Sequence, residues 1–350
     1  MSAAPFHIIG DNMKVFDTAK HWAGKITYAA LKMFPERAKN KMALLIYLLQ
    51  NEPDSLMVNY DRRKWQDVTL EKIDRHFCGL DAQSLRTIKE FILKTRVFPL
   101  ANPRFHHPFI WPALCSGPEY QIWAEVETQM LEAKRKYQLG EDANELSSLV
   151  YHHGLKDLSP GLKEYIRGKV FIDAGAFVGD SSLVMLEYGP DKIIAFEPVP
   201  SIARQFEETM RRNAIPSDRV ELVVRGLSDS TGEVCFCENN SGSTCDSQGG
   251  VRVDLVTLDE YLQQQLSNVA CGFIKADLEG MGLAMLKGSI GTIRRDRPIL
   301  SLSIYHNQEE FWGIYDLLRS LDLGYVFKIE KQCAPWENHE LTLIATPSLS

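Results

Sequence analysis

Three ionisable side chains alternate in the segment FIKADLEGMG, residues 273–282. In an extended strand Lys275, Asp277 and Glu279 would share one face. Such groups are costly to gather at the end of a strand without a purpose, and a carboxylate there can accept a proton from an attacking hydroxyl. The structural alternative is a salt bridge between Lys275 and Asp277, with Glu279 capping the next helix.

His306 is a third candidate for proton transfer. It follows a predicted strand in the segment LSIYHNQEE, and the unperturbed pKa of histidine lies near neutrality. It could equally cap a helix that begins near Gln308. Asp277, Glu279 and His306 could also hold a divalent metal that orients a diol, but their spacing alone defines no metal site, and we expect none.

A glycine turn follows an earlier apolar strand, in the segment FIDAGAFVGD. Its spacing is D-x-G-x-x-x-G, not the G-x-G-x-x-G that cradles a pyrophosphate. S-adenosylmethionine has no phosphate and carries a positive sulfonium, so the acidic Asp173 would suit its amino and sulfonium end. The alternative is a structural turn with a capping aspartate. The residues expected to bind the cofactor here are Asp173, Gly175, Ala176, Phe177 and Gly179.

Glu197 ends the next predicted strand in the segment AFEP, about 20 residues beyond the turn. A carboxylate at this place accepts hydrogen bonds from a ribose diol, and we expect Glu197 and Pro198 to contact the nucleoside. Ser228 and Asp229, in the segment RGLSDSTG, are placed to meet the adenine, or they simply turn the chain.

These residues need a sheet to position them, and the sequence from about residue 168 onward predicts one. Short apolar strands alternate with amphipathic helices, which indicates a mostly parallel sheet covered on both faces. Ligands of such sheets bind at the carboxyl ends of the strands. The strands are expected at 169–173, 192–196, 220–224, 273–276, 298–304, 325–329 and 341–345, with helices at 180–188 and 201–213.

The first 150 residues have a different texture. They are poor in glycine, and the segments 41–50, 82–93 and 120–137 show helical periodicity, whereas the prolines of segment 100–112 forbid a continuous helix. We therefore predict a helical domain of unassigned function over residues 1–150 and an α/β domain over residues 151–350. The helical domain is expected to shape the acceptor site or to form a homo-oligomer.

Composition sets broad limits on function. The chain has 350 residues, of which 45% are hydrophobic, and a formal net charge of −7, which argues against nucleic acid or an anionic membrane as the main partner. No apolar run is long enough to span a bilayer. Seven cysteines without framework spacing favour a reducing cytoplasm.

The ordered pieces DAGAFVGDSS, AFEP, GLSDSTG, VTLDEYL, FIKADLEG and ELTLIATP resemble the FkbM-type methyltransferases, over roughly residues 154–347. The resemblance implies a class I, Rossmann-like methyltransferase fold with seven strands, the last antiparallel. It also implies S-adenosylmethionine as cofactor and O-methylation of a sugar, glycan or polyketide-like hydroxyl. The sequence departs from the family at MGLAML after Gly280, where a second acidic residue is usual.

Two rival functions remain at this point. One is an interaction protein that binds the nucleoside without catalysis, and the other is a nucleotide-dependent oxidoreductase, which the missing G-x-G-x-x-G disfavours. Cys235, Cys237 and Cys245 lack a fourth ligand and are expected to pack beside the loop at 239–250 rather than hold zinc. That loop could close over the site as a lid.

Overall fold

The computed structural model contains a seven-stranded mixed sheet. It describes residues 65, 67–97, 117–140, 146–237, 244–245, 251–265, 269–333 and 339–349. The strand order is β10-β11-β9-β8-β1-β2-β3, and β11 runs antiparallel to both of its neighbours, whereas the other pairs are parallel. The strands are β1 (Val170–Ala174), β2 (Ile193–Phe196), β3 (Val220–Val223), β8 (Cys271–Ala276), β9 (Ile299–Ser303), β10 (Tyr325–Lys331) and β11 (Leu341–Pro347).

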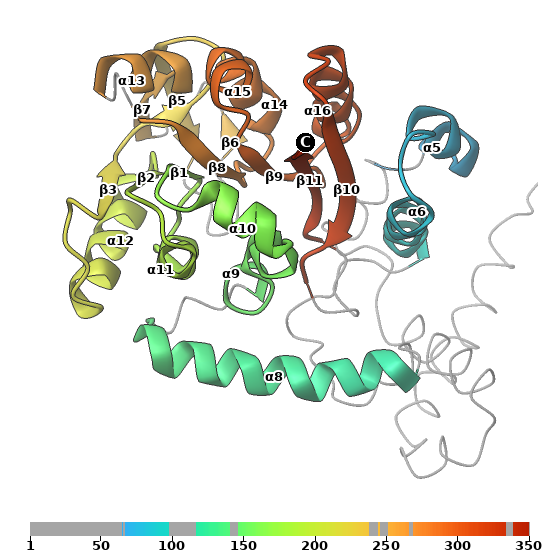
Figure 1. The fold of residues 1–350 in the computed structure, drawn as a ribbon, viewed down its shortest axis with the longest axis horizontal. Coiled ribbons are helices and arrows are strands. Elements are labelled where there is room, and N and C mark those ends of the chain that lie inside the picture. Colours follow the sequence, from blue (N-terminus) through green and yellow to red (C-terminus); the bar gives the residue numbers. More distant parts are fainter. Residues whose placement is uncertain are drawn as a thin grey trace, which may run out of the picture. The chain divides into compact units, whose positions relative to one another are not determined.

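Helices cover both faces of this sheet (Figure 1). One face carries α10 (Pro160–Ile166), α11 (Asp180–Met185) and α12 (Pro200–Arg212). The other carries α13 (Leu258–Gln265), α14 (Gly282–Lys287), α15 (Ile290–Asp296) and α16 (Gln308–Ser320). Because β1, β2, β8 and β9 are buried along their whole length, they read as continuous apolar runs, which is the pattern of parallel strands covered on both faces. Phe171 and Phe273 pack with Phe206 and Met210 of α12 in the core on the first face.

A second, small sheet interrupts the alternation of strands and helices. Its order is β4-β7-β5-β6, with β4 (Gly226–Leu227), β5 (Gly232–Cys237), β6 (Thr244–Cys245) and β7 (Val251–Val256). The sequence did not predict this sheet as a unit. The predicted lid lies outside the described residues, except for β6.

Helices also precede the first strand. They are α5 (Leu70–His76), α6 (Ala82–Val97), α8 (Gly117–Tyr137), α9 (Leu146–Leu149) and the 3₁₀ helix η2 (His152–Asp157). Residues 67–93, 126–333 and 339–350 form one compact unit, and the other unit lies almost wholly outside the described residues. Within the first unit, Phe77 packs against Phe311, Trp312 and Tyr315 of α16.

The predicted strands of the main sheet are confirmed to within a few residues, as are the helices over 82–93 and 120–137. The helix predicted at 180–188 is α11 followed by a 3₁₀ turn, Leu186–Tyr188. Its N-cap is Gly179, and Asp180 is the first helical residue. The segments 41–50 and 100–112 lie outside the described residues, and the domain boundary near residue 150 stays a prediction.

Candidate active site

The glycine turn after β1 passes between the ends of β2 and β8. Gly175 has φ +75°, and a Cβ there would lie 1.9 Å from the carbonyl oxygen of Asp277. The amides of Gly175 and Ala176 both donate to the carbonyl of Phe196, each at 3.0 Å. Only glycine tolerates this approach of two backbones, so the first predicted glycine is required by the contact with β8.

Asp173, in β1, connects this turn to α11 and to Lys275 of β8. Its Oδ2 accepts hydrogen bonds from the hydroxyls of Ser181 (2.6 Å) and Ser182 (2.7 Å). Its Oδ1 lies 3.3 Å from Nζ of Lys275, which donates to the carbonyl of Gly175 at 2.6 Å. Burial lowers the pKa of Lys275, but the charges of Asp173, Asp277 and Asp180 outweigh it and raise that pKa. Asp173 is therefore enclosed by protein partners, and its predicted contact with the cofactor stays a prediction.

Glu197 directly follows β2, and its predicted contact with a ribose diol stays a prediction. The side chain is buried, and its two oxygens accept hydrogen bonds from the amides of Phe177 (3.1 Å) and Val199 (2.9 Å). Burial raises the pKa of Glu197 to about 7, although both amide hydrogen bonds act in the opposite direction. A carboxylate offers about four lone-pair positions, so two remain for hydroxyl donors.

Ser228 and Asp229 follow β4 of the small sheet instead of the end of β3. Ser228 is buried and its amide donates to Val256, while Asp229 is exposed. A Cβ on Gly226 would lie 3.8 Å from that of Pro198, so β4 does run beside the end of β2. The predicted adenine contact of this pair is compatible with that position and stays a prediction.

His306 joins the carboxylates at the ends of β8 and β9. Its Nε2 lies 3.0 Å from Oδ1 of Asp277 and 3.9 Å from Oε2 of Glu279, and its Nδ1 lies 3.0 Å from Oε2 of Glu310. Burial lowers the pKa of His306, but Asp277 and Glu310 outweigh it and raise the pKa to about 10. Burial alone would raise the pKa of Asp277, but His306 and Lys275 outweigh burial and hold this pKa well below its usual range. His306 is thus an imidazolium at neutral pH.

This environment removes the reason for which His306 was considered as a base, a pKa near neutrality. The alternative that His306 caps the following helix is also wrong, because Asn307 is the N-cap of α16 and its side chain accepts from the amide of Glu310. His306 is instead held between two carboxylates, and any role it has in the reaction is that of a fixed positive charge or a hydrogen-bond donor.

Glu279 is the accessible carboxylate of this cluster. Its side chain is 54% exposed, against 22% for Asp277 and 1% for Glu310. Its φ of +49° is in the left-handed region, so it lies in a turn beyond β8, and the predicted alternation with Lys275 and Asp277 stops at Ala276. Burial raises its pKa, which makes it a better proton acceptor than an ordinary glutamate.

Comparison with known proteins decides the family. A family profile, the methyltransferase FkbM domain, matches residues 173–327. These residues form an FkbM methyltransferase domain. No curated protein sequence matches the chain.

Among solved structures, the fold of the FkbM domain is similar to that of methyltransferase FkbM from Methylobacillus flagellatus KT, with a TM-score of 0.52 and 16% identity. The match covers 87% of this chain and 65% of that one, so this chain spans about two thirds of that protein's length. An rRNA methylase from Streptococcus thermophilus matches with a TM-score of 0.37 and 14% identity, over 54% of this chain and 92% of that one. Fibrillarin from Aeropyrum pernix, with natively bound S-adenosyl-L-methionine, matches with a TM-score of 0.35 and 14% identity, over 56% and 74%.

The predicted class I fold is confirmed: the chain has the seven-stranded sheet with one antiparallel strand, and helices precede it. This is an S-adenosylmethionine-binding fold. The residues present fit that cofactor, because Glu197 keeps two acceptor positions for a diol and the turn at Gly175 offers backbone in place of side chains. Without a phosphate-binding glycine pattern, the oxidoreductase alternative has no support.

Sequence reasoning missed part of the site of the FkbM domain. His153 is buried, and its Nε2 lies 2.9 Å from Oγ of Ser148. Ser148 in turn hydrogen-bonds Asp180, at the start of α11. Burial and the charge of Lys275 lower the pKa of His153 to about 3, so the imidazole is neutral. Its φ of +47° is strained for a non-glycine residue, and only the following Gly154 signals that in the sequence.

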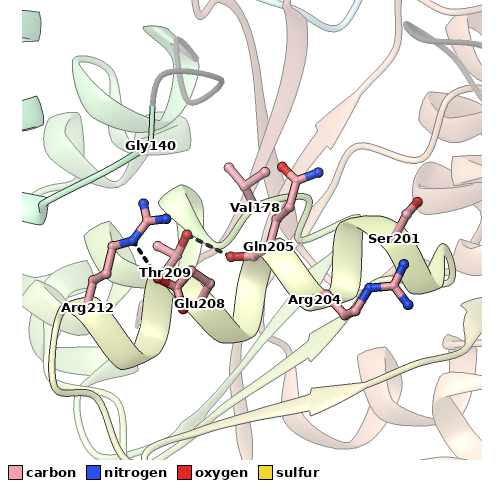
Figure 2. Close-up of a pocket in the computed structure, with 8 residues that line it drawn as sticks. All are labelled: Gly140, Val178, Ser201, Arg204, Gln205, Glu208, Thr209 and Arg212. Carbon is pink, nitrogen blue, oxygen red and sulfur yellow. Dashed lines mark hydrogen bonds and ion pairs between the residues drawn. The ribbon is translucent and has the colours of Figure 1, made fainter.

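A cavity along α12 lies apart from the cluster around His306. A cavity of about 320 Å³ runs along α12 and is lined mainly by polar side chains, including Arg204, Glu208 and Arg212 (Figure 2). It shares none of the predicted site residues and borders the glycine turn only through Val178, so we do not assign the chemistry to it.

In the described part of the chain, no group of three or more His, Cys, Asp or Glu side chains is arranged to hold a metal, and no helix is long and apolar enough to cross a membrane.

Proposed function

We propose that the FkbM domain transfers the methyl group of S-adenosylmethionine to a hydroxyl oxygen of a small-molecule or glycan acceptor, such as a sugar or a polyketide-like natural product. The observation that carries this proposal is the exposed Glu279 carboxylate beside the Asp277–His306 ion pair. A neutral hydroxyl must lose its proton during methylation, and Glu279 is the accessible acceptor with a raised pKa.

In this reaction the cofactor supplies a methyl group on a good leaving group, a sulfonium. Glu197 holds the ribose, and the Gly175 turn lets the nucleoside approach the backbone. Glu279 would take the proton of the acceptor hydroxyl when the methyl group is transferred to its oxygen. Asp277 and His306 fix each other in place. Alignment of the two reactants accounts for most of the acceleration in such displacements, on the order of 7–11 kcal/mol.

The first test is calorimetric titration with S-adenosylhomocysteine, with NAD as a control ligand. Glu197→Gln keeps the shape of the side chain but loses one acceptor oxygen and the charge, and we expect it to weaken binding roughly ten- to hundredfold. Glu207→Gln, on the exposed side of α12, should bind like the native protein. Equal affinities in all three proteins would remove Glu197 from the cofactor site.

The second test addresses the reaction. Transfer of a labelled methyl group should occur to alcohols of a glycan and polyketide panel, and Glu279→Gln should lower kcat by about a hundredfold or more, the usual contribution of a general base. Glu309→Gln, an exposed acidic residue of α16, is the matched control. Tight S-adenosylhomocysteine binding without transfer to any acceptor would instead favour the interaction-protein function.

We also propose a cellular location and an oligomerisation region for this protein. We expect a cytoplasmic protein, because Cys78, Cys235 and Cys271 are free thiols. We expect any homo-oligomer to form through the N-terminal helical region, which light scattering of the full chain tests directly.

A further inference from the structure

The acceptor end of the site carries more negative than positive charge. Asp277, Glu279 and Glu310 lie within 3.9 Å of His306, and the charge of Glu340 acts on Glu279. In the described part of the chain, these carboxylates form ion pairs with His306 and, in the case of Glu340, with His339. Lys275 also lies close, but it is salt-bridged to the buried Asp173. The cluster therefore has four carboxylates against two histidine side chains.

Glu340 is the most informative member. Its side chain is 6% exposed, and its Oε2 is buried without a hydrogen-bond partner. Its other oxygen, Oε1, accepts from the hydroxyl of Tyr305 at 2.7 Å and lies 3.5 Å from Nδ1 of His339. The centroid of the Tyr305 ring lies 4.1 Å from that of His306, so Tyr305 connects the Glu340 carboxylate to the cluster of Asp277, Glu279 and His306.

The backbone holds these two carboxylates in place at a cost. Glu279 and Glu340 both have left-handed φ values, +49° and +55°. Residues other than glycine rarely adopt this conformation, and it persists where the surroundings enforce it. The two lie close enough for the charge of Glu340 to raise the pKa of Glu279. Strain and repulsion thus converge on the same pair.

A ligand has to compensate this charge, because a buried carboxylate without a partner is unfavourable. S-adenosylmethionine brings a sulfonium, an ammonium and a carboxylate, so it adds only one net positive charge, which does not balance four carboxylates against two histidines. A neutral polyol donates hydrogen bonds but no charge. A divalent metal lacks a suitable ligand group among the described residues. An organic ammonium needs only acceptors, which the cluster has.

We propose that Glu340 and Glu279, together with the hydroxyl of Tyr305, form a subsite for an ammonium group of the acceptor, so that the methylated molecule is an amino alcohol. This inference rests on the proposed function. Glu279 then has two neighbours on the same ligand, the ammonium that it helps to bind and the hydroxyl whose proton it accepts.

The experiment compares two probes that differ in one group. Ethanolamine carries one hydroxyl and one ammonium group, whereas ethylene glycol carries two hydroxyls on the same two-carbon chain. Each is titrated into the full chain saturated with S-adenosylhomocysteine, at matched ionic strength, and the dissociation constant is taken from the rise in Tm. We expect ethanolamine to bind at least about tenfold more tightly, which corresponds to about 1.4 kcal/mol.

Variants assign that preference to the subsite. Glu340→Gln keeps the shape and removes the charge, and we expect it to abolish the preference, while Glu309→Gln retains it. Without probes, Glu340→Gln should melt at or above the native Tm, because it removes an uncompensated buried charge. If that variant does not fold, Tyr305→Phe serves instead and should reduce the preference.

The outcomes separate the two proposals. Failure of S-adenosylhomocysteine to bind would overturn the proposed function itself. Normal S-adenosylhomocysteine binding with equal affinity for both probes, or a preference for ethanolamine that survives in Glu340→Gln, would overturn the ammonium subsite alone.

Discussion

At the scale of single residues, His306 shows how neighbours reassign a side chain. Asp277 and Glu310 flank its two ring nitrogens at 3.0 Å each and raise its pKa to about 10. In the unfolded chain the pKa returns to about 6.5. The folded protein therefore holds the proton more tightly, and this ionic stabilisation is complete below pH 6.5 and is lost as the pH rises toward 10.

This difference predicts a pH-dependent effect of His306→Gln. The free energy of unfolding that the variant loses relative to the native protein should be largest at pH 6.5 and should shrink toward pH 10, as measured by urea denaturation. His152→Gln is the matched control, because burial lowers the pKa of His152 to about 4 and that ring stays neutral throughout the window. A constant difference between His306→Gln and the native protein would show that His306 is uncharged.

The sequence identified several site residues by type and spacing but could not supply their surroundings. Glu197, Asp277 and Glu279 were selected because ligands of an α/β sheet bind at the carboxyl ends of its strands, and their contacts with a ligand stay predictions. The enclosure of Asp173 by Ser181, Ser182 and Lys275 and the charge of His306 arise from tertiary contacts, which no local pattern contains. Glu340 lies 61 residues beyond Glu279 and carries no motif of its own, so only the fold reveals it.

At the scale of elements, the contact between the Gly175 turn and the end of β8 joins the turn to the cluster of Asp277, Glu279 and His306. The carbonyl of Asp277 abuts the Cα of Gly175, and the amide of Asp277 donates to Ala174 at 3.1 Å. A shift of this turn therefore displaces Asp277, and with it His306. Precise positioning in the site thus depends on the absence of a single side chain.

Gly175→Ala tests that dependence. The new Cβ would lie 1.9 Å from a backbone oxygen, so we expect a loss of several kcal/mol of stability and of S-adenosylhomocysteine binding. Gly168→Ala provides the control, because Gly168 has a similar φ of +70° but nothing within 4 Å of the added atom. It should lose only the conformational term, of order 1–2 kcal/mol. Equal losses in both variants, measured by chemical denaturation, would contradict a steric role for the turn.

Element prediction succeeded where periodicity and burial agree. The central strands are short, buried and mainly apolar segments, and they are where the sequence placed them. The small sheet was missed because β4 and β6 contain two residues each, too few to show any period, and because their pairing with β7 and β5 is set by contacts distant in sequence. Ser228 directly follows β4 and donates its amide hydrogen to Val256 of β7, so its environment depends on this sheet and was not predicted.

At the scale of the whole molecule, residues 67–93 belong to the same compact unit as the methyltransferase sheet. Phe77 is fully buried, and its ring lies 5.4 Å from that of Phe311 and 5.0 Å from that of Tyr315. Since α16 also carries Glu310, the aromatic contact and the ion pair of Glu310 with His306 share one helix.

Phe77→Ala should therefore destabilise the methyltransferase domain itself, by about 3–5 kcal/mol. The measurement is thermal unfolding followed both by circular dichroism and by loss of S-adenosylhomocysteine binding, and we expect both transitions to fall together. Cys78→Ala, at the exposed neighbouring position, should leave both unchanged. An unaltered ligand-binding transition in Phe77→Ala would mean that these helices fold independently of the site.

The hydroxyl of Ser84 on α6 has a consequence for how this protein can be divided. Strand β10 lies at one edge of the sheet. The amide of its Ile329 donates a hydrogen bond to the hydroxyl of Ser84 at 2.9 Å instead of to another strand. Exposed strand edges recruit strands from other molecules and promote aggregation. A fragment that begins at residue 151 would uncover this edge, and its self-association would be an artefact of the cut. Homologous fragments for crystallisation or assay should start before α5.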